Sequence, residues 1–354
     1  MDFSQLTVID ASTVLAGPSV GMFFAELGAK VVKVEHPLHG DVTRSWKLPS
    51  EDENAEVSAY FSSVNYKKEY RKLDYTKAAD RQEFLDLVAS ADILLTNFKV
   101  GDAEKFNLTT EVLQGVNPKL IHGRISGFGQ DSDRVAYDLI LQAESGFMSM
   151  NGTPESGPVK MPVALIDVLA AHQLKEGILI ALLQRMHDNK AKIVDVSLYK
   201  AAISSLVNQA TNYLMQGHIA RRVGSLHPNI APYGEIFLTQ DDKLITFAIG
   251  SNKHFFKLCQ ILDCLELVDH EKYAYNQVRV INRTKLHALL QDKIELLDSK
   301  ELLDALHKEY IPAGIIRSIN EVFEDQHARE MILEEEIEGV QTKRLSSIAF
   351  EIKD

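Results

Sequence analysis

Short apolar runs alternate with helical patterns through the first 130 residues, and this alternation constrains the fold more than any other feature. Leu6–Asp10 and Lys30–Glu35 have the composition of strands, and Ser19–Leu27 between them has helical spacing that begins at Gly17-Pro18. Proline suits a first helical turn because its missing N–H has no partner there. The pattern continues with helices over residues 80–89 and 109–115 and strands over 91–96 and 119–125. Such alternation predicts an α/β fold, a parallel sheet covered by helices in a Rossmann-like layer architecture.

The second half of the chain changes its pattern at one place. A long helical segment, Ala164–Arg185, is followed by a strand, Lys192–Ser197, and a helix, Ala201–Met215. Periodicity is then lost over His218–Pro232, which predicts a domain boundary. Beyond it, residues 233–238 and 244–249 predict an antiparallel hairpin, with helical patterns over 253–262, 285–297 and 300–310 and a capping box at 318–321. A length of 354 residues agrees with roughly two domains.

Charge and composition exclude several classes of protein. Asp plus Glu number 50 and Lys plus Arg 38, a net charge of -12 that disfavours binding to nucleic acid or to an anionic membrane. The longest apolar stretch, 161–183, contains Asp167, His172, Lys175 and Glu176, so it predicts a buried helix rather than a membrane span. Two cysteines and the absence of a basic, then apolar, N-terminal segment predict a cytoplasmic location without disulfides. An enzyme is the favoured class.

Motifs for common cofactors are missing from the sequence. No G-x-G-x-x-G follows the first strand, and neither a Walker A motif nor a G-x-S-x-G elbow occurs. His36 and His39 are three residues apart without a third ligand nearby, so no metal site is expected. Cys259 and Cys264 lie in a helical pattern and are interpreted as small buried hydrophobic residues.

Asp167 is the most unusual residue of the chain because its neighbours in Pro162–Ala171 are almost all apolar. An isolated carboxylate among apolar groups is costly, since burial disfavours its charged form. One interpretation is a helix N-cap that accepts hydrogen bonds from free backbone N–H groups. The other is a nucleophile or base at a helix N-terminus, where the helix dipole favours ionisation. Both interpretations remain open at this point.

A basic run, Asn65–Lys72, holds four cations and two tyrosines, and further lysines occur at 30, 33, 99 and 105. Such a run is often a solvated surface. The alternative is a groove for an anionic ligand that carries an aromatic ring, with lysines on phosphates and tyrosines beside the ring.

Motifs that follow one another along nearly the whole chain carry a resemblance. They are Val14–Pro18, Leu27–Glu35, Gly40–Arg44, Asn97–Phe98 with Gly101, Ile125–Gly129, Ala136–Asp138, Val194–Leu198, His227–Pro228, and Asn276 with Arg279, Asn282 and Arg283. In this order and spacing they resemble the class III CoA-transferase family. Its members include formyl-CoA:oxalate, carnitine and succinyl/glutarate CoA-transferases, and alpha-methylacyl-CoA racemase is a relative.

The resemblance implies a function for Asp167, which lies thirty residues beyond Tyr137. In this family the corresponding aspartate attacks an acyl-CoA thioester and forms a mixed anhydride, then an aspartyl-CoA thioester. The racemase has a histidine base at the position of Tyr137, and tyrosine, with a reference pKa near 10, is a poor substitute. Transfer of CoA from an acyl-CoA to a carboxylic acid is therefore expected. A racemase or epimerase, or a non-catalytic CoA-binding homologue, remains the alternative.

Further site residues are implied by the same resemblance. Oxyanion and substrate contacts are expected from Gly250, Ser251 and Asn252 together with Tyr137. Coenzyme A contacts are expected from Leu15, Ala16, His36, Asn65, Lys67, Lys68, Asn97, Phe98, Lys99, Lys105, Val135 and Asp138. The family usually has arginine where His36 and Lys105 stand, and some members have a run of glycines at Gly250.

The resemblance also implies an architecture. A large Rossmann-like domain is expected over residues 1–217, a smaller α+β domain over 218–325, and a C-terminal segment, 326–354, that returns to the large domain. Two chains would interlock as a homodimer. Acyl-CoA and a small carboxylic acid are the expected substrates, with no permanently bound cofactor.

Overall fold

The computed structural model describes residues 2–353, which divide into two compact units. The larger comprises the chain up to Ser149, Lys160–Ala220 and everything from Glu330 onward. The smaller comprises Met150–Val159 and Arg221–Arg329. The sequence placed the boundaries after residues 217 and 325, and it contained no signal that separates Met150–Val159 from its neighbours.

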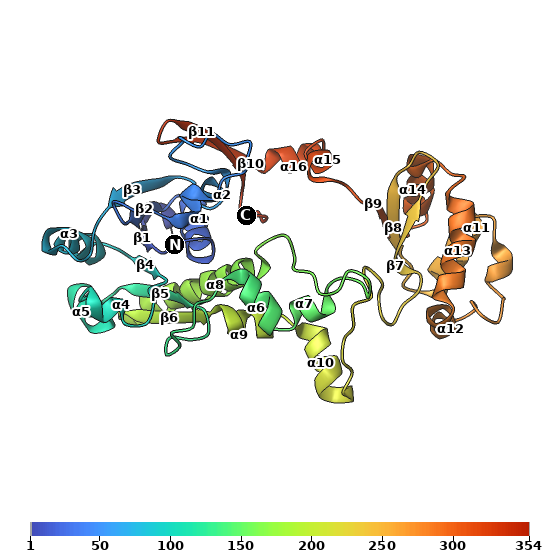
Figure 1. Ribbon diagram of the computed structural model, residues 1–354, viewed down its shortest axis with the longest axis horizontal. Helices are drawn as coiled ribbons and strands as arrows, with labels where there is room; N and C mark the ends of the chain where they lie inside the picture. Colours follow the sequence, from blue (N-terminus) through green and yellow to red (C-terminus); the bar gives the residue numbers. More distant parts are fainter. Residues whose placement is uncertain (1, 354) are drawn as a thin grey trace. The chain divides into compact units, whose positions relative to one another are not determined.

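A six-stranded parallel sheet forms the larger unit, in the order β3-β2-β1-β4-β5-β6 (Figure 1). Its strands are β1 (Thr7–Ala11), β2 (Lys30–Glu35), β3 (Lys68–Lys72), β4 (Ile93–Thr96), β5 (Ile121–Ser126) and β6 (Lys192–Ser197). The predicted α/β class with a parallel sheet is confirmed. β3 is the strand that the sequence did not reveal, because it lies inside the basic run.

Helices cover both faces of this sheet, as the sequence of each strand requires. Successive side chains of a strand point to opposite faces, so Val8 and Ile9 of β1 enter different cores. The Val8 side packs against the helices α1 (Ala16–Glu26), α8 (Leu165–Asp188) and α9 (Leu198–Ser204). The Ile9 side packs against α3 (Ala78–Ala89) and α5 (Thr110–Val116).

The other elements of the larger unit are short helices and a hairpin. They are η1 (Phe3–Gln5), η2 (Val42–Ser45), α2 (Ala59–Ser62), α4 (Asp102–Lys105), α6 (Asp138–Glu144), α7 (Phe147–Met150), α10 (Val207–Gln216), β10 (Ile332–Ile337) and β11 (Val340–Leu345). One helix was expected over Ala201–Met215, and this was wrong. The positive φ of Val207, 43°, interrupts the helical backbone and separates α9 from α10.

The β10–β11 hairpin, which the sequence did not predict, packs beside α2 (Figure 1). Ile337 at the end of β10 is buried against Phe61 of α2. Arg44 pairs with Glu338 at 2.7 Å, and the carboxylate of Glu335 accepts the backbone N–H of Lys67 at 3.0 Å. The C-terminal segment is therefore joined to the rest of the larger unit by apolar and polar contacts, and the Ser347 N–H also donates to Glu26 at 2.9 Å.

The smaller unit contains a three-stranded antiparallel sheet, and the predicted hairpin is confirmed as β7 (Tyr233–Leu238) and β8 (Leu244–Ala248), with β9 (Ala313–Ile315) beside β8. Its helices are α11 (Asn252–Ile261), η3 (Leu265–Leu267), α12 (Asn276–Ile281), α13 (Arg283–Ile294), α14 (Ser299–Lys308), α15 (Ile319–Val322) and α16 (Gln326–Glu330). Ser318 and Glu321 form the predicted capping box of α15. Between residues 2 and 353, no helix is both long enough and apolar enough to cross a bilayer.

Candidate active site

The main candidate site lies where the order of the parallel sheet reverses. The chain runs outward from β1 to β2 and β3, then crosses to β4 on the other side of β1. Ligands of open α/β sheets bind at the carboxyl ends of the strands at such a switch point. A cavity of about 410 Å³ occupies this place, lined by residues that follow β1, β4 and β5, among them Thr13, Val14, Asn97, Phe98, Lys99, Val135 and Tyr137.

The loop after β1 forms one wall of this cavity and is held from two sides. The Asn97 amide bonds the Thr13 backbone twice, accepting its N–H at 3.1 Å and donating to its carbonyl at 3.1 Å. Val14 has a φ of 75°, which is rare for a β-branched residue, and its N–H donates to the Asp41 carboxylate at 3.1 Å. Leu15 and Ala16, two of the expected CoA contacts, follow directly at the start of α1.

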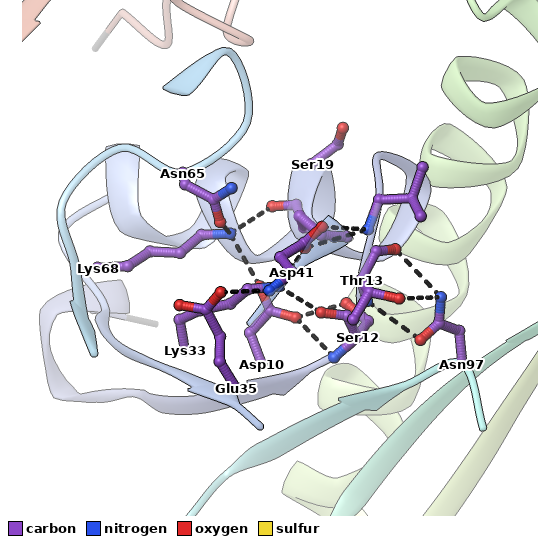
Figure 2. A network of polar contacts seen from close by, with 12 residues as sticks. Asp10, Ser12, Thr13, Ser19, Lys33, Glu35, Asp41, Asn65, Lys68 and Asn97 are labelled. Atoms are coloured by element: carbon purple, nitrogen blue, oxygen red, sulfur yellow. Dashed lines mark hydrogen bonds and ion pairs between the residues drawn. The ribbon is translucent and has the colours of Figure 1, made fainter. Parts of the chain in front are cut away.

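A buried ionic network contacts the loop after β1 (Figure 2). The side chains of Asp10, Lys33, Asp41 and Lys68 are fully covered. Lys68 Nζ lies 2.8 Å from Asp10, and Lys33 Nζ lies 3.1 Å from Asp41 while also donating to the Ser12 carbonyl. Burial alone would raise the pKa of Asp10, but the charges of Lys33 and Lys68 outweigh it and lower the pKa. The network therefore consists of mutually compensated charges.

Lys68 and Asn65 belong to this network, and the structure places neither where a bound phosphate could reach its side chain. The Lys68 ammonium donates to Asn65 Oδ1 at 2.9 Å and to the Pro18 carbonyl at 2.8 Å, and both side chains are buried. Burial, followed by the charge of Lys33, lowers the pKa of Lys68 to about 8. The side chains of Lys68 and Asn65 are therefore already engaged in hydrogen bonds within the network.

The remaining expected contacts are distributed over several places. Lys67 precedes β3, at the opposite end of this strand from the carboxyl edge. His36 follows β2 and lines a second cavity of about 780 Å³, with His39 stacked on it at 4.7 Å. Lys105 is exposed at the end of α4. Of the predicted set, Asn97, Phe98, Lys99, Val135 and Tyr137 are thus brought together around one cavity.

Asp167 is the third residue of α8, 7% exposed, and no hydrogen bond reaches its carboxylate from residues 2–353. The N-cap interpretation of Asp167 is therefore wrong. Asp138 performs that function instead, because its Oδ1 accepts the N–H of Ile166 at 2.7 Å. Its other oxygen accepts from Gln142 at 2.6 Å, so Asp138 joins α6 to the first turn of α8. Its expected contact with CoA stays a prediction.

The surroundings of Asp167 disfavour its ionised form. Burial, and then the charge of Asp138, raises the pKa of Asp167 to about 7. Burial and the charges of the same two aspartates raise the pKa of Tyr60 to about 12, so its hydroxyl stays protonated. A carboxylate that is buried, free of hydrogen bonds and half ionised near neutral pH is a good candidate for a nucleophile.

Aromatic side chains that the sequence analysis missed lie in the same region. Trp46 contacts Tyr60 edge-on, with ring centres 5.0 Å apart, and its ring lies 6.4 Å from that of Tyr137. Tyr137 also lines the cavity and directly precedes Asp138. Trp46 is the only tryptophan of the chain and follows the Gly40–Arg44 motif closely, which is the signal that could have revealed it.

The Gly250–Asn252 loop lies in the smaller unit, between β8 and α11. Ser251 caps α11 by accepting the N–H of His254 at 3.1 Å. Asn252 Oδ1 accepts from the buried guanidinium of Arg279 at 2.9 Å. Both polar side chains are thus occupied by hydrogen bonds within the smaller unit.

Across the described residues there is no group of three or more His, Cys, Asp or Glu that could hold a metal ion.

Comparison with known proteins identifies the family of the chain. A model of CoA-transferase family III matches residues 3–353. The chain belongs to this family. A CAIB/BAIF family protein from Brucella suis has a similar structure, with a TM-score of 0.87 and 35% identity over 99% of this chain and 93% of that one.

Several curated CoA-transferases are similar over most of the chain. A succinate–glutarate CoA-transferase from Agrobacterium fabrum is 36% identical over 95% of this chain and 85% of its own. A mouse succinyl-CoA:glutarate CoA-transferase is 34% identical over 90% and 72%, respectively. An acetyl-CoA:oxalate CoA-transferase from Acetobacter aceti is 33% identical over 90% and 82%.

Proposed function

We propose that this member of family III transfers CoA from an acyl-CoA to a free carboxylic acid, with Asp167 as the nucleophile. The observation that carries the proposal is the buried Asp167 carboxylate, which accepts no hydrogen bond within residues 2–353 and has a pKa raised to about 7. Its neighbour Asp138 directly follows Tyr137, which lines the cavity at the switch point. Relatives named for transfer to glutarate and oxalate support a dicarboxylic acid as acceptor and succinyl-CoA as donor.

The reaction needs only acyl transfers. The Asp167 carboxylate attacks the thioester carbonyl, so a C–O bond forms, the C–S bond breaks and CoA leaves as thiolate. The thiolate then attacks the Asp167 carbonyl carbon and releases the donor acid as a carboxylate. The acceptor carboxylate attacks the resulting aspartyl thioester and forms a second anhydride, while the C–S bond breaks and CoA leaves again as thiolate. The thiolate finally attacks the acceptor acyl carbon, which regenerates Asp167.

The surroundings of Asp167 suit these steps. A carboxylate without hydrogen-bond donors is less stabilised than one in water, so its attack requires less desolvation. The helix dipole of α8 favours the ionised form of Asp167, because this residue lies in the first turn of the helix. Each tetrahedral intermediate develops an oxyanion that needs a donor. We assign this role to the protonated hydroxyl of Tyr60, which lies in the same unit as Asp167.

Incubation with succinyl-CoA and a panel of carboxylic acids tests the function, with new CoA thioesters measured by liquid chromatography and mass spectrometry. We expect glutaryl-CoA with glutarate as acceptor. Hydroxylamine added with succinyl-CoA alone should leave a hydroxamate on Asp167. Binding of CoA without any new thioester would favour the non-catalytic homologue. Exchange of an alpha proton of the acyl group with solvent deuterium would favour the racemase.

In a plot of kcat/KM against pH, the decrease on the acid side should occur at a pH far above the usual pKa range of aspartate. Because only the ionised nucleophile reacts, and the pKa of Asp167 is raised to about 7, kcat/KM should fall as the pH decreases through about 7. Initial rates from pH 5 to pH 9 measure this limb. A limb near pH 4 would contradict the assignment of Asp167 as a buried nucleophile.

We also propose that the protein functions as a homodimer, as the family resemblance implies. Support comes from exposed apolar side chains on α10, where Val207, Leu214 and Met215 are 69%, 79% and 71% exposed. Sedimentation equilibrium at micromolar concentration tests it, and a folded species with the mass of one chain would contradict it.

A further inference from the structure

A buried histidine lies in the wall of the switch-point cavity and is not used by the mechanism above. His122 on β5 is 5% exposed and lines the cavity together with Thr96 at the end of β4. His122 Nε2 and Thr96 Oγ1 are 2.9 Å apart. The other ring nitrogen, Nδ1, is buried and has no hydrogen-bond partner among the described residues.

The strand pairing explains how these groups come together. β4 and β5 are neighbours in register, with Leu94 opposite His122 and Thr96 opposite Arg124. Ile121 and Ile125 of β5 belong to the core beneath α1 and α8, so the alternating residues His122 and Arg124 point to the other face of the sheet. The cavity extends along this face, since Leu108 and Thr110 near α5 also line it.

The hydrogen-bond donors and acceptors of His122 and Thr96 are not all paired within the described residues. If Thr96 donates its hydroxyl proton to Nε2, the hydroxyl is satisfied and only the Nδ1–H donor is left over. In the other tautomer Nε2 donates, and both the Thr96 proton and the Nδ1 lone pair lack a partner. The first tautomer leaves fewer buried groups unpaired, and an unpaired buried polar group is costly. The pair therefore presents one N–H donor without an acceptor.

The charge of the surroundings restricts the acceptor. Burial and then the charge of Arg124 lower the pKa of His122 to about 3, so the imidazole is neutral. Arg124 itself is neutralised by two hydrogen bonds to Asp195, at 2.6 and 2.7 Å. Phe98 and Leu108 line the same cavity. Lys99 also lines the cavity, but it is exposed, whereas His122 is buried and Arg124 beside it is already paired with Asp195. A phosphate buried against His122 would therefore lack a buried cation, which is expensive, and a neutral acceptor needs none.

We propose that His122 is a ligand-binding residue whose Nδ1–H donates a hydrogen bond to a neutral acceptor of CoA, an amide carbonyl of its pantetheine arm or a ring nitrogen of its adenine. The proposal rests on the proposed function, because it takes CoA as the occupant of this cavity. Thr96 acts as a positioning residue that fixes the tautomer. The net value of one buried hydrogen bond corresponds to a loss of affinity of about five- to tenfold when the donor is removed.

Isothermal titration calorimetry of the full chain tests this with two variants. His122→Phe keeps a planar ring without nitrogen and should weaken CoA binding about five- to tenfold. His122→Asn places an N–H donor close to the position of Nδ1 and should restore most of the affinity. Pantetheine and adenosine 3′,5′-bisphosphate, titrated separately, distinguish the two acceptors, because only the half that contains the acceptor should lose affinity in His122→Phe.

A second measurement does not depend on how the variants fold. In wild-type protein labelled with ¹⁵N-histidine, the Nδ1–H resonance of His122 should shift when CoA is added. Unchanged CoA affinity in a folded His122→Phe, an equal loss for both halves of CoA, or an unmoved Nδ1–H resonance would overturn the proposal. Wild-type protein that binds CoA in none of these experiments would instead overturn the proposed function, and this inference with it.

Discussion

Replacement of Asp167 by asparagine is expected to lower kcat for CoA transfer by at least about 10³-fold, as loss of a covalent nucleophile does in other enzymes. The side-chain amide has nearly the same shape but cannot form the acyl anhydride, so the fold and CoA binding should persist. Initial rates with succinyl-CoA and glutarate measure the effect. The matched control is Asp188→Asn at the opposite end of α8, an exposed residue paired with Lys192, which should leave kcat unchanged.

The same substitution should stabilise the protein, which a purely structural aspartate would not do. The pKa of Asp167 is raised from 3.8 to about 7, so the folded state holds its proton more tightly than the unfolded state. Ionisation of Asp167 therefore removes stability as the pH rises from about 4 to above 7. Asparagine does not ionise, so the free energy of unfolding of the variant should exceed that of wild type by about 4 kcal/mol at pH 8, with little difference at pH 4. Lower stability at pH 8 together with normal kcat would contradict the assignment.

The parallel sheet could be predicted from sequence because its signal is local. Each strand except β3 has its own apolar pattern, and the order of the strands needs the structure. The burial of Lys68 could not be predicted from the basic run, Asn65–Lys72, because its cause lies far away in the sequence. Lys68 has the composition of a surface lysine, and its burial depends on Asp10, which lies 58 residues away in sequence. No pattern within residues 65–72 contains that pairing.

In the candidate site, too, features that depend on neighbours in the sequence could be predicted, and features that depend on distant residues could not. The burial of Asp167 followed from its apolar neighbours and is confirmed. Its role as an N-cap was wrong, because the N–H of Ile166 is taken by Asp138, 28 residues earlier. Trp46 and Tyr60 reach the same region from a loop and a one-turn helix, where neither period nor spacing indicates a direction. Sequence thus predicted the burial of Asp167, while the residues around it could be identified only from the tertiary structure.

Replacement of Lys33 by methionine is expected to destabilise the larger unit by about 3–5 kcal/mol, the usual cost of breaking a buried ion pair from one side. Lys33 lies in β2 with its side chain fully covered, 3.1 Å from Asp41 and 4.0 Å from Asp10. Its loss leaves two buried carboxylates with Lys68 as the remaining cation of the network. Urea unfolding followed by the fluorescence of Trp46, the only tryptophan, measures the free energy of unfolding of this unit.

Lys30→Met provides the matched control, because Lys30 is on the same strand but pairs with Glu69 at 3.5 Å with both side chains about half exposed. An exposed pair contributes about 0–1 kcal/mol, so this variant should unfold almost as wild type does. Lys33→Met should also weaken CoA binding, because Lys33 orients Asp41, which holds Val14 in its unusual backbone conformation at the cavity wall. Equal stability of the two variants would show that the buried network contributes no more than a surface pair. The strained loop after β1 would then have to be held by Asn97 alone.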